Sequence, residues 1–227
     1  MFVVSARWQE AYPTAAVGVL TMQGVTNPQG HPELSQQKAA LEERLRARYG
    51  GYERADLKAL PVMAAYVEYY SRFKKTYHIL LQLESITFQG KEIPRVAGLV
   101  EAMFMAELED HLLTAGHDLA VVEPPVRIDV ARGDERYERL NGRMQTLKAG
   151  DMYIADAQGV LSSIIYGPDR RTSIRPQTEQ VLFTAYGPPG IGAAAVGHHL
   201  ENIRDKVLIV APEAEVTALE VYEGGDG

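Results

Sequence analysis

The sequence changes its pattern at Pro124 and Pro125, and this change constrains the fold more than any other feature. Before the two prolines, apolar residues recur three and four positions apart over long stretches, which is typical of helices that pack on a core. After them, short β-branched and aromatic runs alternate with Gly or charged turns, which is typical of strands. Helices followed by strands, rather than a regular alternation of the two, predict an α+β fold.

The same patterns give approximate positions for the elements. In the first half we expect a strand at residues 17–25 and helices at 35–49, 60–73, 77–89 and 94–113. In the second half we expect strands at 126–131, 136–140, 151–155, 160–166 and 180–186, a helix at 191–205, and closing strands at 207–210 and 216–222. Residues 1–223 are predicted to form a single domain, helix-rich at about 31–120 and strand-rich at about 126–223, before a disordered Gly-rich tail at 224–227.

The amino-acid composition excludes several kinds of site and partner. The chain has no cysteine, which excludes disulfides, thiolate metal sites and a cysteine nucleophile, and favours a cytoplasmic location. No stretch reads as a signal peptide or a membrane span, so we expect no membrane partner. With a formal net charge of -7, the molecule as a whole repels phosphates, so any nucleic-acid role needs a local basic patch. DNA is not expected as a partner.

Two groups of basic residues could form such a patch. Arg170, Arg171 and Arg175 lie within six residues of each other and suit phosphate or carboxylate, and Thr172 adds a hydroxyl to the same segment. They suit equally well a solvated loop that pairs with Asp169 and Glu179. The second group is diluted by neighbouring acidic residues, and it comprises Arg132, Arg136, Arg139, Arg143 and Lys148. If the two groups adjoin in the fold, they could contact a few phosphates.

Histidines offer one candidate and one rejected site. His117 follows the predicted long helix, and on an extended segment its side chain would share a face with that of Ala115. It is therefore a candidate acid-base or water-positioning group, although it could equally cap a turn together with Asp118. The adjacent pair His198 and His199 cannot point the same way on a helix, so we expect no metal site there. No cofactor is expected either.

Several segments in order resemble the tRNA-binding and editing module of the phenylalanyl-tRNA synthetase beta subunit, and free-standing proteins built from that module alone. They include the opening strand after Tyr12-Pro13 and the tyrosine-rich helix within 62–73, where Tyr66 and Tyr70 are more simply explained as core residues. Further segments are the Ile-Pro stretch at 91–100, the turn Ala115-Gly116-His117-Asp118-Leu119, and residues 132–142 and 150–183. The resemblance spans about residues 12–205. It implies a three-layer α+β domain with a β-sandwich of unusual topology flanked by helices.

The resemblance also implies a chemistry, with two departures. In the synthetase this module helps to position tRNA and hydrolyses tyrosine wrongly attached to it, using a glutamate after a Gly-Gly pair and a histidine. This chain has Gly167-Pro168-Asp169 in place of the first motif and Ala115 in place of the histidine. The pocket is therefore altered, and the sequence leaves open whether the chain is an enzyme.

Our hypothesis from the sequence is an RNA-linked protein that binds the acceptor end of tRNA or aminoacyl-tRNA. If it is an enzyme, it would be an aminoacyl-tRNA deacylase that hydrolyses mischarged esters in trans. His117 and Thr172 would be catalytic, and Arg170, Arg171 and Arg175 would hold phosphates. The predicted substrate-binding residues are Asp169, Ser162, Ser163 and Tyr166. The alternatives are a small-molecule module that binds an amino acid or an aminoacyl-like compound without tRNA, and a purely structural domain. The oligomeric state stays open.

Overall fold

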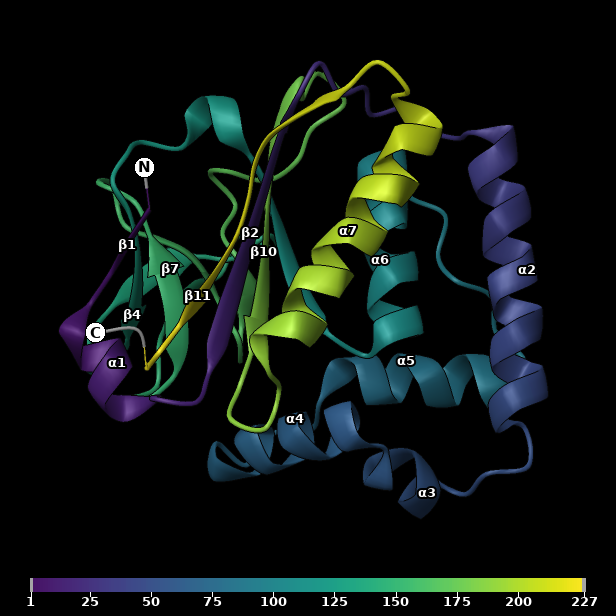
Figure 1. Ribbon diagram of the computed structural model, residues 1–227, viewed down its shortest axis with the longest axis horizontal. Helices are drawn as coiled ribbons and strands as arrows, with labels where there is room; N and C mark the ends of the chain where they lie inside the picture. Colours follow the sequence, from purple (N-terminus) through teal and green to yellow (C-terminus); the bar gives the residue numbers. More distant parts are fainter. Residues whose placement is uncertain (1, 226–227) are drawn as a thin grey trace.

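The computed structural model describes residues 2–225 and shows an α+β fold in which two sheets pack against helices. The α+β class predicted from the sequence is confirmed. Figure 1 shows the layers side by side: a five-stranded sheet, a four-stranded sheet, and the helices α6 (Gly98–Asp110) and α7 (Ala193–Val210). The predicted tail falls partly on residues 226–227, which lie outside the described residues, while Gly224 donates a hydrogen bond from its N–H to the carbonyl of Ala15.

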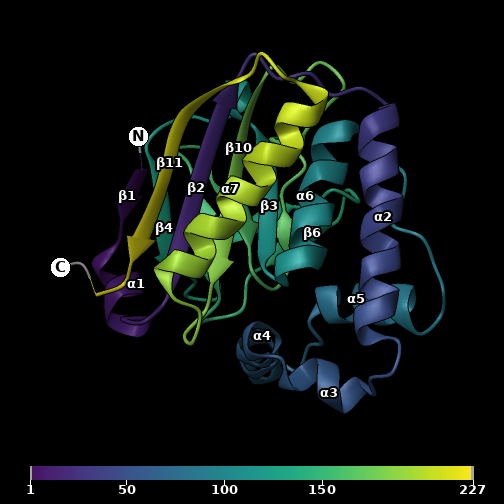
Figure 2. The same ribbon diagram turned by 45° about the vertical axis from the view of Figure 1, so that its right-hand side comes forward.

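The four-stranded sheet joins both halves of the sequence. Its strand order is β11-β2-β10-β3, with antiparallel pairing throughout. The strands are β2 (Ala16–Gln23), β3 (Leu113–Asp118), β10 (Gln180–Gly187) and β11 (Glu215–Glu223). Figure 2 shows α7 lying across this sheet, and a Cβ on Gly18 would come within 2.5 Å of Val196 on that helix. The helix can approach this closely because Gly18 has no side chain.

The five-stranded sheet has the order β1-β4-β7-β8-β9 and mixes parallel and antiparallel pairs. Its strands are β1 (Phe2–Val4), β4 (Val126–Val130), β7 (Met152–Ala155), β8 (Val160–Ser163) and β9 (Gly167–Pro168). The inner face, with Ile128 and Ile154, joins the main core, and the outer face is covered by a small hairpin. The hairpin consists of β5 (Arg136–Glu138) and β6 (Met144–Thr146).

The remaining helices close the molecule. They are α1 (Ala6–Ala11), α2 (Pro32–Tyr49), α3 (Arg54–Ala59), α4 (Pro61–Arg72), α5 (His78–Thr87) and the 3-10 turn η1 (Leu119–Val121). The predicted core role of Tyr66 and Tyr70 is confirmed, since they are 0% and 3% exposed. Within residues 2–225, every helix is too short or too polar to span a lipid bilayer.

Two sequence predictions of elements were wrong. The strand predicted at 207–210 is the end of α7, because Ile203, Val207 and Val210 are buried at helical spacing. The long helix predicted to reach Leu113 ends at Asp110, because His111 adopts a left-handed conformation with φ 61°. Leu113 begins strand β3 instead, and this strand carries His117 into the space between the sheets.

Candidate functional site

The loop that connects β9 to β10 carries the predicted arginine segment and is pinned at several points. The N–H of Asp118 donates to the carbonyl of Thr172 at 2.7 Å, which fixes the loop to the end of β3. Asn27 donates from Nδ2 to the carbonyl of Arg175 at 2.9 Å, and the hydroxyl of Thr178 donates to Asp118 at 2.9 Å. Asp118 also caps η1 through the N–H of Ala120, as the structural alternative for this turn proposed.

A chain of buried polar side chains runs from the core to this loop. His117 Nδ1 lies 2.8 Å from the Thr172 hydroxyl, and His117 Nε2 lies 3.1 Å from the Ser162 hydroxyl. Ser162 Oγ in turn lies 2.7 Å from the hydroxyl of Tyr186, and Thr172 donates to the carboxylate of Asp169. We call these five residues the hydrogen-bond chain. It links β10, β8, β3 and the loop, so it joins both sheets.

The charge on Asp169 fixes the direction of every donor in this chain. An ionised carboxylate only accepts, so the single proton of Thr172 points to Asp169. Thr172 Oγ1 must then accept from Nδ1–H of His117, which leaves Nε2 to accept from Ser162. The Ser162 oxygen is then free to accept from Tyr186. Each hydroxyl and the imidazole thus has one defined role, with the ring as the Nδ1–H tautomer.

The environment keeps the imidazole neutral. Burial, helped by the nearby Arg171 guanidinium, lowers the pKa of His117 to about 3. Its ring is 0% exposed, and both ring nitrogens are occupied by hydroxyl partners. The pKa of Asp169 is raised, chiefly because the carboxyl is desolvated, against the opposing effect of Thr172. In this arrangement His117 orients Thr172 and Asp169 instead of contacting a ligand itself.

Beyond Asp169 lies a cavity of about 400 Å³ that we call the arginine cavity. It is lined by residues of the hairpin, the β7–β8 turn and the loop, namely Arg136, Tyr137, Glu138, Gln158, Gly159, Val160, Asp169, Arg170, Arg171 and Arg175. Arg136 belongs to the second basic group of the sequence and the other three arginines to the first. The two groups therefore adjoin, which the sequence left open.

The four arginines differ in how firmly they are held. Arg171 is locked, with its guanidinium 2.8 Å from the buried carboxylate of Asp156, 3.6 Å from Asp169 and 3.1 Å from the Val121 carbonyl. Arg170 forms an ion pair at 2.8 Å with Glu138, and both side chains are largely exposed.

The guanidinium groups of Arg136 and Arg175 make fewer contacts with the protein. The guanidinium of Arg175 donates to the Arg171 carbonyl at 3.3 Å and forms no ion pair within the described residues. Arg136 is exposed and has no ion pair among residues 2–225. Arg136 and Arg175 therefore offer the most available donors.

The other predicted substrate-binding residues lie apart from this site. Ser163 follows Ser162 on β8, so its side chain points to the opposite face of the sheet, where it lies close to Asp151. Tyr166 is partly buried on the same outer face and donates from its N–H to Ser163 Oγ at 3.2 Å. The structure thus brings together His117, Thr172, Asp169 and Ser162 with the predicted arginines. It does not bring Ser163 and Tyr166 to the hydrogen-bond chain.

Sequence reasoning missed two residues of this site. Tyr186 ends the hydrogen-bond chain, and its only signal in the sequence is its place two residues after Thr184 in an alternating strand. Asp156 anchors Arg171 and also accepts from the N–H groups of Glu123, Gln158 and Gly159 at 2.9–3.1 Å, the pattern of an Asp at a tight turn. Arg136 was not missed, because the sequence already placed it in the second basic group.

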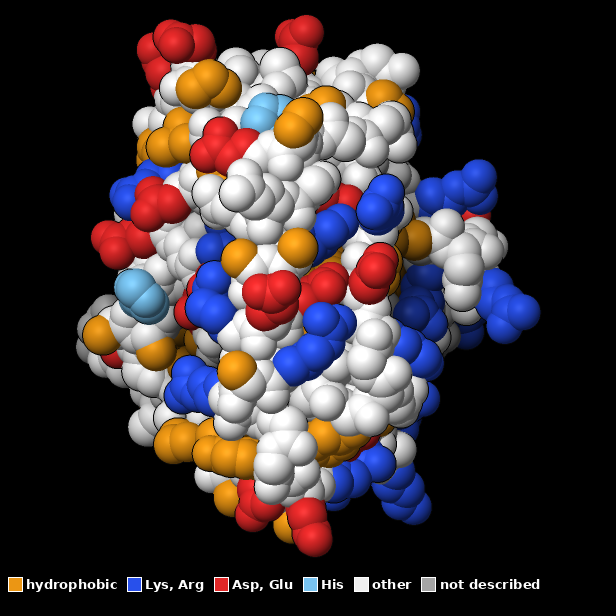
Figure 3. All heavy atoms as spheres, turned by 90° about the vertical axis from the view of Figure 1, so that its right-hand side faces the viewer, with side chains coloured by type: hydrophobic (Ala, Val, Ile, Leu, Met, Phe, Trp, Pro, Cys, Tyr) orange, Lys and Arg blue, Asp and Glu red, His pale blue; other side chains and the backbone are white. Residues whose placement is uncertain are grey.

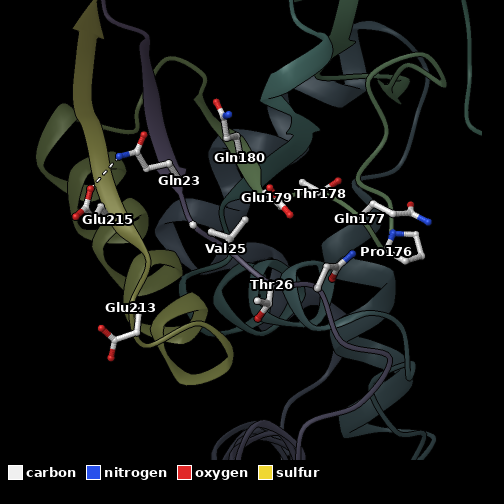
Figure 4. A pocket seen from close by; sticks show the side chains of 12 residues that line it. Gln23, Val25, Thr26, Pro176, Gln177, Thr178, Glu179, Gln180, Glu213 and Glu215 are labelled. Atoms are coloured by element: carbon white, nitrogen blue, oxygen red, sulfur yellow. Dashed lines mark hydrogen bonds between the residues drawn. The ribbon is translucent and has the colours of Figure 1, made fainter.

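A larger cavity of about 810 Å³ lies at the far end of the same loop (Figure 4). Its lining includes Glu179, Glu213 and Glu215 and no Lys or Arg, and Gln23 bonds to Glu215 at 2.8 Å. Such a lining repels phosphate. Within residues 2–225, no group of three or more His, Cys, Asp or Glu residues could hold a metal ion.

Comparison with known proteins finds similarity in structure but none in sequence. The structure is similar to a crystal structure of an N-terminal fragment of the phenylalanyl-tRNA synthetase beta subunit from Pyrococcus horikoshii, with a TM-score of 0.49 and 12% sequence identity. The match covers 97% of this chain and 50% of that chain, so this chain spans about half the length of that fragment. No family model and no curated protein sequence matches the chain. A likeness of this size assigns no function.

Proposed function

We propose that the chain binds the acceptor end of a tRNA or aminoacyl-tRNA, with terminal phosphates in the arginine cavity. The observation that carries the proposal is that Arg136, Arg170 and Arg175 line one cavity although they come from two separate parts of the sequence. A guanidinium presents a planar fork of donors that matches two phosphate oxygens. The order of the sequence motifs that resemble the synthetase module supports RNA as the source of the phosphate.

The distribution of charge supports the same partner. Residues 123–180 contain nine Lys and Arg and nine Asp and Glu, so the net charge of -7 comes entirely from the rest of the chain. Four of the five aspartates of this stretch are buried, whereas seven of its nine basic residues are exposed and the other two are partly exposed. The buried aspartates are Asp129, Asp151, Asp156 and Asp169. By contrast, the face covered by α2 mixes acidic and basic side chains (Figure 3).

The proposal includes hydrolysis of a mischarged ester. A hydrolytic site needs a group at the cavity that takes a proton from water. Asp169 is the buried carboxylate that lines the cavity, and burial raises its pKa, which makes the carboxylate a stronger base. Thr172 donates a hydrogen bond to this carboxylate and is itself contacted by His117, so we assign both residues a positioning role in the step.

The hydrolytic part is tested by a deacylation assay over a panel of mischarged tRNAs. We expect release above the uncatalysed rate for at least one of them, and loss of that release in Asp169→Asn with RNA affinity changed less than twofold. No release for any member of the panel would contradict hydrolysis and leave the binding part standing, because binding is measured separately.

A second candidate is a module that binds a small anionic molecule such as an amino acid or an aminoacyl-like compound. The observation that favours it is the size of the arginine cavity, since about 400 Å³ falls within the ~300–1,000 Å³ typical of small-ligand sites. Thermal shift measurements with amino acids and their amides separate the two candidates. A ligand at 100 times its dissociation constant stabilises the fold by ~2.7 kcal/mol, whereas RNA binding shows itself by a steep dependence on salt.

A further inference from the structure

A second cavity, which we call the tyrosine cavity, opens on the outer face of the five-stranded sheet. Its volume is about 330 Å³, and it is lined by three arginines, three acidic residues and a tyrosine, namely Arg7, Arg127, Arg132, Asp129, Asp134, Glu135 and Tyr153. Tyr153 belongs to β7, and Arg127 belongs to the neighbouring strand β4. The proposed RNA-binding site does not use this cavity.

The tyrosine cavity and the arginine cavity lie beside one small apolar cluster. Tyr137 and Tyr153 are both buried in this cluster, which packs the β5–β6 hairpin against the outer face of the sheet. Tyr137 also lines the arginine cavity, and Tyr153 lines the tyrosine cavity. The chain passes directly from one cavity to the other, because Arg132 and Glu135, which precede β5, line the tyrosine cavity, and Arg136, the first residue of β5, lines the arginine cavity.

Tyr153 presents an unused donor to the second cavity. The residue is 4% exposed, and its hydroxyl makes no hydrogen bond to any residue within 2–225. The hydroxyl oxygen is open to the cavity, since it is not one of the fully buried side-chain atoms that lack a partner among the described residues. Because Tyr153 lines the cavity, a ligand oxygen there would complete its hydrogen bonding.

The arginines beside Tyr153 also retain donors. Arg132 has no ion pair within the described residues, and Arg127 engages Asp129 through Nε alone, at 3.4 Å. Asp129 is already bonded by Ser5 at 2.6 Å and by the Val130 N–H at 2.8 Å.

Glu135 accepts from the main-chain N–H of Arg132 at 2.9 and 3.0 Å, and of Gly133 at 3.0 Å. The buried Asp129 and the partly buried Glu135 are thus satisfied within the protein, whereas Asp134, the third carboxylate of the lining, is exposed to solvent. The guanidinium groups and the phenol remain as donors for an oxyanion.

We propose that the tyrosine cavity binds a backbone phosphate of the same RNA whose terminal phosphates occupy the arginine cavity, so that the strand passes over the β5–β6 hairpin. This inference rests on the proposed function. A phosphate supplies several acceptor oxygens at once, which matches two arginine forks and a phenol hydroxyl. The RNA would contact both sides of a single hairpin.

The test compares RNAs of two lengths, a fluorescent CCA trinucleotide and a minihelix hairpin with the same single-stranded end. Arg132→Ala and Tyr153→Phe should each weaken minihelix binding about tenfold, the effect of losing a hydrogen bond to a charged group. Arg132→Ala should also lower the slope of log affinity against log salt by roughly 0.7–0.9. Neither variant should change trinucleotide binding. Lys58→Ala, an exposed change on α3, is the matched control.

The outcomes separate the two proposals. If the trinucleotide and the minihelix both bind but neither variant weakens the minihelix, the second phosphate site is wrong and the proposed function stands. If neither RNA binds the wild-type chain, the proposed function fails and the second site fails with it. Tyr153→Phe keeps the buried ring, and its melting temperature should match that of the wild type.

Discussion

His117 Nδ1 lies 2.8 Å from the hydroxyl of Thr172, and this contact joins the space between the sheets to the loop that lines the arginine cavity. The two residues are 55 positions apart in the sequence, and both are fully buried. The loop conformation therefore depends on a polar contact inside the molecule as well as on its own turns. The first prediction follows from this contact.

Replacement of His117 by alanine should destabilise the fold by about 2–4 kcal/mol, because it leaves buried hydroxyl groups without partners and opens a cavity. Urea unfolding followed by circular dichroism measures this change. His198→Ala serves as the control, since His198 is exposed on α7 and should cost less than about 0.5 kcal/mol. Equal losses of stability for the two variants would show that the hydrogen-bond chain does not contribute to the stability of the fold.

Arg171→Ala should lower the stability of the fold, whereas Arg136→Ala should weaken RNA binding with little change in stability. The Arg171 guanidinium holds the buried carboxylate of Asp156, so its loss should cost about 1–3 kcal/mol after allowance for its partial exposure. Arg136 has no ion pair within the described residues, so its loss should change stability by less than about 0.5 kcal/mol while weakening RNA binding. Thermal unfolding and fluorescence anisotropy on both variants check this. If Arg171→Ala were as stable as the wild type, the claim that the ion pair of Arg171 with Asp156 stabilises the loop would be wrong.

Glu107 should make stability depend on pH. Its Oε1 accepts from the Thr114 N–H at 2.7 Å, its buried Oε2 has no partner among the described residues, and burial raises its pKa to about 8. The folded state therefore keeps a proton that the unfolded state has lost above about pH 4.5. This group lowers stability as pH rises from about 4.5 to 8, and its effect is constant above that.

Glu107→Gln tests this linkage, because glutamine keeps the acceptor for Thr114 and cannot ionise. The stability of Glu107→Gln relative to the wild type should increase steadily between pH 5 and pH 8 in urea unfolding. Parallel stability curves over that range would mean that Glu107 has an ordinary pKa.

Gly18→Ala tests the contact between the four-stranded sheet and α7. An added Cβ would lie 2.5 Å from the side chain of Val196 and 2.8 Å from that of Leu200, so these side chains, or the helix and strand that carry them, must shift. We expect a loss of about 1–3 kcal/mol, as for other overpacked cores. Gly30→Ala is the matched control, because nothing lies within 4 Å of a Cβ at that position and its φ is not left-handed. A neutral Gly18→Ala would show that the helix sits farther from the sheet.

The sequence predicted what depends on local patterning and missed what depends on long-range pairing. The α+β class and most helices follow from apolar spacing, and His117 was placed on the same face as Ala115 if its segment were extended, as β3 is. The helix that was expected to reach Leu113 ends earlier, because a left-handed residue at His111 gives no sign in the apolar pattern.

The site shows the same division. Thr172 and the arginines of its loop could be picked out by their chemistry, because they are close together in the sequence. Tyr186 could not, since its role depends on the pairing of β10 with β3 and on the stacking of the two sheets. Ser162 and Ser163 could not be told apart either, because strand register alone decides which one faces His117.

The most direct test of the central claim is the affinity for a CCA-ended RNA as a function of salt, measured by anisotropy for the wild type and for the double variant Arg136→Ala/Arg175→Ala. We predict that log affinity falls linearly with log salt for the wild type. In the double variant the slope should be smaller by about 1.4, which corresponds to two lost phosphate contacts on a single strand. An absence of binding, or identical affinities and slopes for the two proteins, would contradict the assignment of the arginine cavity to RNA.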